Sequence, residues 1–256
     1  MNLSKTCNFI AKWIKEYSKK HGNKTLVVGV SGGIDSALTS TLCAISGVKT
    51  LLVSIPIHQR TQEVNNATTH MEWLEKDYSN IETMNIELTN LFEEYVSTIP
   101  LKYQCELGFA NSRARLRMTI LYQMATKENG LVVGTGNKIE DFGIGFFTKY
   151  GDGGVDISPI ADLTKSEVKE LARFCQVDKK IMEADPTDGL WEDGRTDEIQ
   201  IGATYKDLEW AMDFNGNRKT NDKEQRILEI YKKFNAQNKH KMSPIPICKI
   251  PTILRG

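Results

Sequence analysis

Cysteine is scarce in this sequence of 256 residues and never occurs in a C-x-x-C pair. The cysteines are scattered and odd in number, which argues against a disulfide framework, a zinc ribbon and a thiol redox pair. Cys43 lies in an apolar segment, where a buried structural thiol is the simplest interpretation. The other four are Cys7, Cys105, Cys175 and Cys248.

An excess of one charge is also missing, since 33 basic residues balance 33 acidic ones. This balance gives no sign of the basic surface that a nucleic-acid binder carries. No apolar run reaches membrane-spanning length, and the N-terminus lacks a signal-peptide core, so we expect a cytoplasmic protein. The 40% apolar content is enough for a sizeable core. We expect one α/β domain over residues 1–256.

The two commonest nucleotide-binding motifs are absent, because no glycine loop ends in Gly-Lys-Ser/Thr and none reads G-x-G-x-x-G. A different loop is present. Residues 25–30 form an apolar run of strand length, S-G-G-I follows, and an apolar-periodic segment runs from Asp35 to Gly47. The glycines permit positive φ and close approach of an anion, and a helix N-terminus favours negative charge. The pattern therefore predicts a phosphate site.

Asp35 is unusual in such a loop, because a carboxylate beside a phosphate is repulsive unless a cation lies between them. One carboxylate plus phosphate oxygens is a common way to hold Mg²⁺. A glycine turn can also be only a tight strand-to-helix connection. The complete string S-G-G-I-D-S is more specific than that and resembles the pyrophosphate-binding loop of N-type ATP pyrophosphatases.

Strand and helix patterns alternate along the chain, which predicts a doubly wound parallel sheet covered by helices on both faces, with a helical C-terminal part. Ligands of such sheets bind at the carboxyl ends of the strands. We therefore expect residues 31–36 and 135–140 to face one site. Expected strands are 25–30, 50–55, 81–88 and 131–135; expected helices are 3–21, 61–77, 90–98, 108–128, 168–175, 203–213 and 222–236, with an extended tail after His240.

Two segments suit loops that cover a ligand. Residues 136–158 are rich in glycine and too long for a plain connector. Residues 184–195 hold two glycines, a proline and several charges, and we expect a mobile loop there. Between the two, Thr164-Lys165-Ser166-Glu167 forms a capping box before a helix. Lys165 in a first helical turn is unfavourable for the helix dipole unless an anion lies nearby.

Four motifs together resemble ammonia-dependent NAD synthetase. They are S-G-G-I-D-S, A-N-S-R-A-R-L-R-M, G-F-F-T-K-Y-G-D-G-G-V-D-I-S-P-I followed by L-T-K, and His240-Lys241. The resemblance implies the adenine nucleotide alpha hydrolase-like fold and a homodimer with residues 108–128 at the interface. It also implies a reaction in two steps. Deamido-NAD is adenylated by ATP with release of pyrophosphate, and free ammonia then displaces AMP to give NAD.

The resemblance also implies site residues. Mg²⁺ would be shared by Asp35 and Glu140, which with Lys165 form the catalytic centre, and Asp152 is a candidate proton acceptor. The ATP site would comprise Gly29, Val30, Ser31, Gly32, Gly33, Ile34, Asp35, Ser36, Thr135, Lys165 and Thr187. The deamido-NAD site would comprise Arg115, Lys149, Asp156, His240 and Lys241.

Simpler interpretations stay open for some of these residues. Asp156 could merely cap a turn, and His240 could be a solvated residue of a lysine-rich tail. Arg113, Arg115 and Arg117 cannot share one helix face, so we expect a solvated or dimer-bridging role for one of the other two.

The chain departs from the commoner bacterial pattern at two places. Gly-Asn-Lys-Ile stands between Thr135 and Glu140, where many relatives have Asp-His-Ala-Ala, and one additional residue follows Glu140. Ser54 occupies a position where some relatives place an ATP-binding arginine, and Arg60 could substitute for it.

Other ATP pyrophosphatases are the alternatives. Thiolation of tRNA requires a reactive cysteine pair, and both it and lysidine formation require a basic surface. GMP synthetase usually carries a glutaminase domain and lacks F-F-T-K-Y-G-D-G-G. A nucleotide-binding sensor without turnover is a further alternative, but it would have little need of two metal carboxylates.

Overall fold

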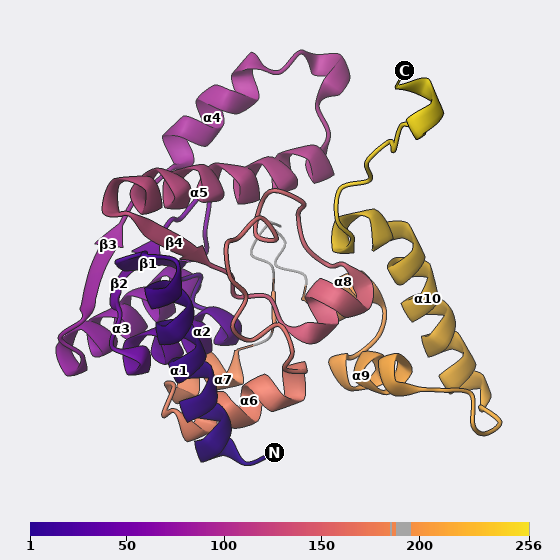
Figure 1. Cartoon of the computed structure of the whole chain (residues 1–256), viewed down its shortest axis with the longest axis horizontal. Coiled ribbons are helices and arrows are strands. Elements are labelled where there is room, and N and C mark those ends of the chain that lie inside the picture. The colour runs from indigo at the N-terminus through magenta and orange to yellow at the C-terminus, as the bar shows by residue number, and fades with distance from the viewer. Residues whose placement is uncertain (185, 188–195, 256) are drawn as a thin grey trace.

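Within the described residues, the sheet has four strands, all parallel, in the order β3-β2-β1-β4. The computed structural model describes residues 1–184, 186–187 and 196–255 (Figure 1). This architecture confirms the predicted parallel sheet with helices on both faces. The strands are β1 (Thr25–Gly29), β2 (Lys49–Ser54), β3 (Ile81–Asn85) and β4 (Gly130–Val133).

The helices of the N-terminal half match the expected ranges to within a few residues, and α3 matches to the residue. They are α1 (Leu3–Lys20), α2 (Ile34–Ser46), α3 (Thr61–Asp77), α4 (Thr89–Thr98) and α5 (Glu106–Glu128). The later helices are α6 (Lys165–Phe174), α7 (Lys179–Glu183), α8 (Asp197–Ile201), α9 (Tyr205–Asp213) and α10 (Asp222–Met242), with a π-helix at Ile139–Ile144 and 3-10 turns at Leu101–Tyr103 and Thr252–Leu254.

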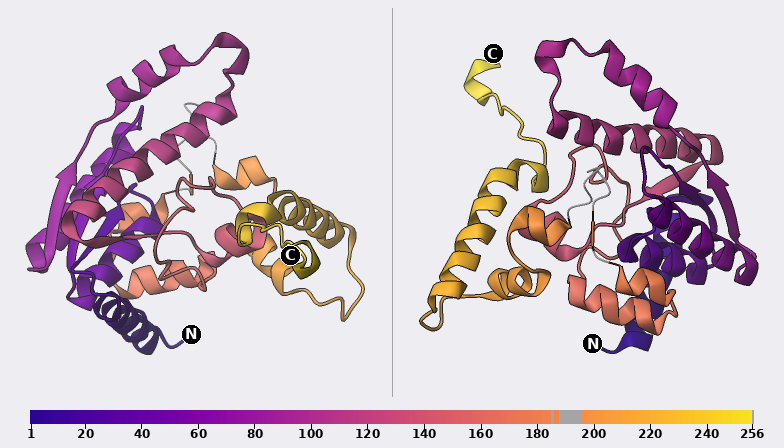
Figure 2. Two further views of the ribbon diagram at one scale, coloured as in Figure 1. Left: turned by 45° about the horizontal axis from the view of Figure 1, so that its top comes forward. Right: turned by 180° about the vertical axis from the view of Figure 1, so that it is seen from behind.

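Two hydrophobic cores form because successive strand residues point to opposite faces of the sheet. Leu26 and Val28 pack with α1, α2, α3 and α6 on one face. Val27 and Val53 pack with α4 and α5 on the other. Both views in Figure 2 show α5 on one side of the sheet and α1 and α6 on the other.

A third apolar cluster stands beside the sheet. Ile139 and Ile144 of the π-helix pack there with Tyr205 and Leu208 of α9, and residues of α10 lie against them. Asn235 and Asn238 of α10 donate to the carbonyls of Gly143 and Ile144 at 2.7 and 2.8 Å. These carbonyls end the π-helix, where donors from the helix itself are lacking, so the two side-chain amides satisfy them.

Several expected boundaries were wrong. Residues 139–144 are helical inside a segment expected to be a loop, α7 and α8 were not expected, and β3 ends at Asn85. Helix α10 continues to Met242, because nothing from residue 237 breaks a helix before Ser243-Pro244. The chain is extended after it, as predicted, except for the turn at 252–254. The loop expected over 184–195 lies mostly outside the described residues.

Within the described residues, no helix is both long enough and apolar enough to cross a membrane.

Candidate active site

The predicted phosphate loop joins β1 to the N-terminus of α2. Gly33 is the N-cap of α2 and uses no side chain for capping, so the first amides of the helix face outward from the loop. The Oγ of Ser36 donates to the Gly33 carbonyl at 2.9 Å and accepts from the Ser31 amide at 3.2 Å. These bonds shape the turn, and the N-terminus of α2, which no side chain caps, suits an anion.

Gly32 is the one residue of this loop that must be glycine. Its φ is +88°, and a Cβ there would overlap the carbonyl oxygen of Glu63 and lie 3.2 Å from the Ala67 amide. Both groups belong to the backbone of α3, which cannot move aside without shifting the helix. The loop is therefore seated directly against α3.

The carboxyl ends of β1 and β4 bring the two predicted metal carboxylates together, as expected. Asp35 opens α2 after β1, and Glu140 follows β4 in the π-helix. Asn137 connects them: its Nδ2 donates to Asp35 Oδ1 at 3.1 Å, while its Oδ1 accepts from the Glu140 amide at 3.2 Å. Asn137 is fully buried, so this amide fixes the spacing of the two acids.

Lys165 lies between these carboxylates. Its Nζ is 2.5 Å from Asp35 Oδ2 and 3.0 Å from Glu140 Oε1, and its side chain is 4% exposed. Burial alone would lower the pKa of Lys165, but the two carboxylates raise it above its usual value, so the ammonium persists. Burial is also the largest influence on Asp35 and raises its pKa. Lys165 lies in the first turn of α6, which is unfavourable for the helix dipole, and the carboxylates of Asp35 and Glu140 compensate for this.

Tyr205 and Asp197 complete this buried cluster, and sequence analysis missed both. The Tyr205 hydroxyl is 2.5 Å from Glu140 Oε1 and 3.1 Å from Asp197 Oδ2. Its ring lies under the Lys165 ammonium, 4.7 Å from the ring centroid. Burial and the neighbouring Glu140 raise the pKa of Tyr205, so the hydroxyl remains a donor. Although burial works against it, Lys165 and Tyr205 hold the pKa of Glu140 below its usual value.

Replacing Tyr205 with phenylalanine removes a charge-assisted hydrogen bond to Glu140 and is expected to cost about 1.5–3 kcal/mol of unfolding free energy. Chemical denaturation measures this loss. Tyr95→Phe is the matched control, because its hydroxyl meets only the neutral Ser112 Oγ at 3.0 Å. We expect about 0.5–1.5 kcal/mol for the control. Equal losses in the two variants would contradict the charged role of the Tyr205 hydroxyl.

Asp141 is a second acid at this strand end. Its carboxylate packs against the backbone of Gly136, where a Cβ would collide with it. Burial, reinforced by Glu140, raises the pKa of Asp141 to about 7. The folded protein therefore keeps this proton through the acid range in which the unfolded chain releases it. The contribution of the protonated Asp141 to the free energy of unfolding is therefore lost as pH rises from about 4 to 7.

Asp141→Asn is accordingly expected to gain stability relative to the natural protein as pH rises. Between pH 5 and pH 8 the difference in unfolding free energy should grow by about 1–2 kcal/mol, a value discounted for partial exposure. Denaturant titrations at both pH values measure it. Asp162→Asn is the control, because that exposed side chain is hydrated in both states. A pH-independent difference for Asp141→Asn would contradict the raised pKa.

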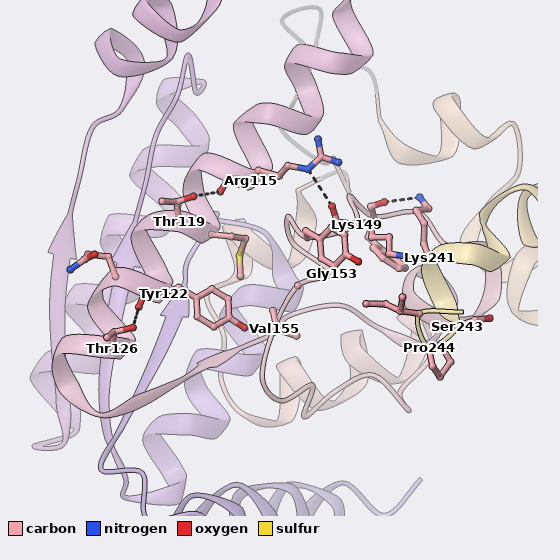
Figure 3. A pocket seen from close by; sticks show the side chains of 16 residues that line it. Arg115, Thr119, Tyr122, Thr126, Lys149, Gly153, Val155, Lys241, Ser243 and Pro244 are labelled. Carbon is pink, nitrogen blue, oxygen red and sulfur yellow. Dashed lines mark hydrogen bonds between the residues drawn. The ribbon is translucent and has the colours of Figure 1, made fainter. Parts of the chain in front are cut away.

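A pocket of about 840 Å³ lies between α5, the loop 147–155 and the end of α10 (Figure 3). Arg115, Lys149 and Lys241 line it, and each donates to a backbone carbonyl. Arg115 Nε meets the Lys149 carbonyl at 3.3 Å, and Lys241 Nζ meets the Phe147 carbonyl at 2.6 Å. Because a carbonyl does not neutralise a cation, the pocket has a positive lining.

The loop 147–155, which lines one side of this pocket, is anchored by hydrogen bonds to α5 and within itself. Thr148 is buried and its hydroxyl donates to Asn111 Oδ1 of α5 at 2.7 Å. The Thr148 amide donates to Asp152 Oδ1 at 3.0 Å, which closes a tight turn. Asp152, the candidate proton acceptor, is thereby placed in the loop next to Gly153, which lines the pocket.

Two of the residues predicted for the pyridine nucleotide lie beside the pocket rather than in its lining. Asp156 accepts from the Val132 amide at 2.8 Å and from the Tyr122 hydroxyl at 3.2 Å, so it supports Tyr122, which does line the pocket. The His240 ring is exposed and meets the Gln237 carbonyl at 3.1 Å, while the His240 carbonyl accepts from Lys149.

Thr135 and Thr187 are two further residues predicted for ATP. Thr135 follows β4 and is half-buried, one residue beyond the Gly134 amide that donates to the Ile157 carbonyl. Thr187 is also half-buried, in a two-residue segment between undescribed stretches. The assignment of both residues to ATP stays a prediction.

The other two arginines of α5 have partners within the chain, so neither has the purely solvated role expected for one of them, and a dimer-bridging role stays a prediction. Arg113 is buried and lies 5.3 Å from the Phe92 ring centroid. Arg117 donates to the Ile55 carbonyl at 2.9 Å and to Gln59 Oε1 at 2.8 Å. Of the two positions considered for ATP, Ser54 is buried and Arg60 is exposed at the N-cap of α3.

The carboxylates fit a divalent cation, because Asp35 Oδ2 and Glu140 Oε1 already converge on one ammonium nitrogen. Within the described part of the chain, no group of three or more His, Cys, Asp or Glu side chains could hold a metal. A cation here would therefore need further oxygen ligands from phosphate or water, which is the usual coordination of Mg²⁺.

Comparison with known proteins identifies the family. The NAD synthase family model matches residues 6–244. The NH(3)-dependent NAD(+) synthetase of Alkaliphilus oremlandii is 37% identical over 96% of this chain and 98% of its own length. The one from Archaeoglobus fulgidus is 34% identical over 99% and 100%. The structure of NMN synthetase from Francisella tularensis superposes with a TM-score of 0.86 at 30% identity, covering 98% and 99%. The chain therefore belongs to the NAD synthase family.

Proposed function

We propose that this protein amidates deamido-NAD with free ammonia, using ATP and Mg²⁺, and releases NAD, AMP and pyrophosphate through an NAD-adenylate. The observation that carries the proposal is the convergence of Asp35 and Glu140 on one cation beside a helix N-terminus that no side chain caps. A basic pocket alone would suit many anions. The combination suits a nucleotide triphosphate whose charge must be neutralised while a second anion attacks it.

In the first step the loop 31–36 binds the leaving pyrophosphate through its amides and the serine hydroxyls. Asp35 and Glu140 would hold Mg²⁺, which supplies charge neutralisation between the substrate carboxylate and the triphosphate. Lys165 keeps these carboxylates at a fixed separation and adds positive charge. Asn137 and Tyr205 orient them, so little reorganisation is needed during the reaction.

The basic pocket supports the second substrate. Arg115, Lys149 and Lys241 present positive charge to the phosphates of a pyridine nucleotide. In the second step ammonia attacks the activated carboxyl carbon and AMP leaves. The nitrogen must lose a proton, and Asp152 in the covering loop is the proposed acceptor.

We further propose a cytoplasmic homodimer with α5 at its interface. Helix α5 and the turn before it expose Leu101, Tyr103, Leu107 and Tyr122. Large apolar side chains left exposed on neighbouring elements suit a protein interface.

A second candidate substrate is nicotinate mononucleotide, which would give NMN by the same chemistry. The observation that favours it is the close match to the structure of an NMN synthetase over nearly the whole chain. Arg115, Lys149 and Lys241 would suit a terminal monophosphate as well as a pyrophosphate, so the pocket accommodates either substrate chemically.

Incubation with ATP, Mg²⁺, ammonium and either deamido-NAD or nicotinate mononucleotide tests both candidates. We expect one mole of AMP per mole of amide product with the true substrate, and no AMP without a pyridine substrate. AMP formation that needs neither compound would contradict both proposals. The ratio of kcat/KM for the two compounds decides between them.

Asp35→Asn is expected to fold normally but to lose AMP formation by about 10³-fold, because the neutral amide is a poor cation ligand. Steady-state assays measure the rate, and circular dichroism confirms the fold. Asp77→Asn, an exposed position at the end of α3, is the control and should keep full activity. Undiminished turnover of Asp35→Asn would show that the metal assignment is wrong.

A further inference from the structure

The fold brings together two cysteines that lie 168 residues apart in the sequence. Cys7 is in α1, and Cys175 is the C-cap of α6. Their sulfur atoms are 3.7 Å apart, which is hydrogen-bond distance for thiols. Both are free thiols in this structure. Their separation in the chain left no spacing signal that sequence analysis could detect.

The surroundings of the pair favour reaction between the thiols over metal binding. Cys7 is 5% exposed, whereas Cys175 is half-buried and reachable from solvent. Tyr17 and Tyr78 pack against the same core cluster. Two thiolates alone do not make a zinc site, and the described residues hold no group of three or more metal-ligating side chains.

We propose that Cys7 and Cys175 form an intramolecular disulfide when the protein meets hydrogen peroxide, and that this bond ties α1 to α6. The site is separate from the proposed reaction and does not depend on it. Its reactant is a small two-electron oxidant that reaches the pair through the exposed part of Cys175.

The chemistry balances with one peroxide. The thiolate of Cys7 attacks a peroxide oxygen, the O–O bond breaks, and a sulfenic acid and water form after protonation. The thiol of Cys175 then attacks that sulfur, and the second water leaves as the S–S bond forms. Two thiols and one hydrogen peroxide give one disulfide and two waters. The hydrogen bond from Cys175 lowers the pKa of Cys7 to about 7, which increases the reactive thiolate.

Closing the bond requires little movement. The sulfur atoms must approach by about 1.7 Å from their present 3.7 Å to reach the S–S length of about 2.0 Å. Rotation about the two side chains can supply much of this approach, because α1 and α6 already contact each other. The crosslink would join the N-terminal helix to the helix that begins with Lys165.

The experiment uses the full chain carrying Cys105→Ser and Cys248→Ser, which removes the two exposed thiols. Serine is a favourable N-cap at position 105, where α5 begins. After peroxide treatment we expect the number of titratable thiols in denaturant to fall from three to one. Peptide mapping without reductant should find the Cys7 peptide linked to the Cys175 peptide. The remaining thiol should be Cys43, because burial raises its pKa to about 12.

A second measurement tests the crosslink between the helices. The oxidised protein is expected to melt about 5 °C or more above the reduced protein, since a long closed loop restricts the unfolded chain. Addition of dithiothreitol should reverse the shift. The same chain with Cys175→Ser is the control and should show neither the linked peptide nor the shift.

Two results would overturn the proposal. One is alkylation of both Cys7 and Cys175 after peroxide treatment, with no linked peptide. The other is a linked peptide without any rise in melting temperature, which would show that the bond does not stabilise the contact between α1 and α6.

Discussion

Replacing Lys165 with methionine lowers the free energy of unfolding by about 3–5 kcal/mol, the usual result of removing one partner from a buried ion pair. The apolar chain fills nearly the same volume, so the loss is electrostatic. Asp35 and Glu140 would then face each other without the ammonium that now lies 2.5 and 3.0 Å from them. Urea denaturation at neutral pH, without divalent cations, measures the loss.

Lys138→Met is the matched control for this prediction. Lys138 pairs with Asp162 at 3.1 Å, but the Asp162 side chain is 98% exposed, so the pair is screened by water. We expect a change of at most about 1 kcal/mol. If Lys165→Met cost no more than this control, the ammonium would not be balancing two buried charges. AMP formation should fall in Lys165→Met and stay unchanged in the control.

Gly32→Ala is the second large effect, with an expected loss of about 2–5 kcal/mol. The φ of +88° costs an alanine about 1–2 kcal/mol, and overlap with the Glu63 carbonyl adds about 1–3 kcal/mol more. The new methyl group must push α3 away or deform the loop. Either change displaces the amides proposed to bind pyrophosphate, so AMP formation should fall together with stability.

Gly47→Ala separates the two contributions. Gly47 is the C-cap of α2, the helix that follows the loop of Gly32. Its φ is +73°, and a Cβ there would meet nothing within 4 Å. This variant therefore carries the backbone cost alone, about 1–2 kcal/mol. The difference between the variants measures the contact between the loop and α3. Equal losses would mean that α3 yields freely and that the loop is not seated against it.

Sequence reasoning predicted the sheet and its helices well, because their signals are local. The apolar runs of β1 and β4 and the periodic pattern of α3 follow directly from residue order. It failed where distant contacts decide the structure. The π-helix 139–144 contains Gly143 and depends on amides from α10, almost a hundred residues later. No local pattern reports such support.

The residues of the candidate site also divide into those with a local sequence signal and those placed by contacts between distant segments. S-G-G-I-D-S and the capping box before Lys165 marked Asp35 and Lys165 directly. Tyr205 was missed, although it occupies the equivalent position after a second capping box, Thr204 with Asp207. That box gives the helix start but not its orientation, and only the fold aims the tyrosine at Glu140. Asn137 was noted as a departure from relatives, and its bridging role appears only when both strand ends are adjacent.

The shared ammonium of Lys165 has a consequence for the order in which ligands arrive. Within the described residues, the carboxylates of Asp35 and Glu140 share one ammonium, so two negative charges face one positive charge at this point. Under the proposed function, a bare triphosphate would be repelled here. A nucleotide should therefore enter only together with its divalent ion or after that ion, and chelation of free metal should abolish nucleotide binding rather than merely slow turnover.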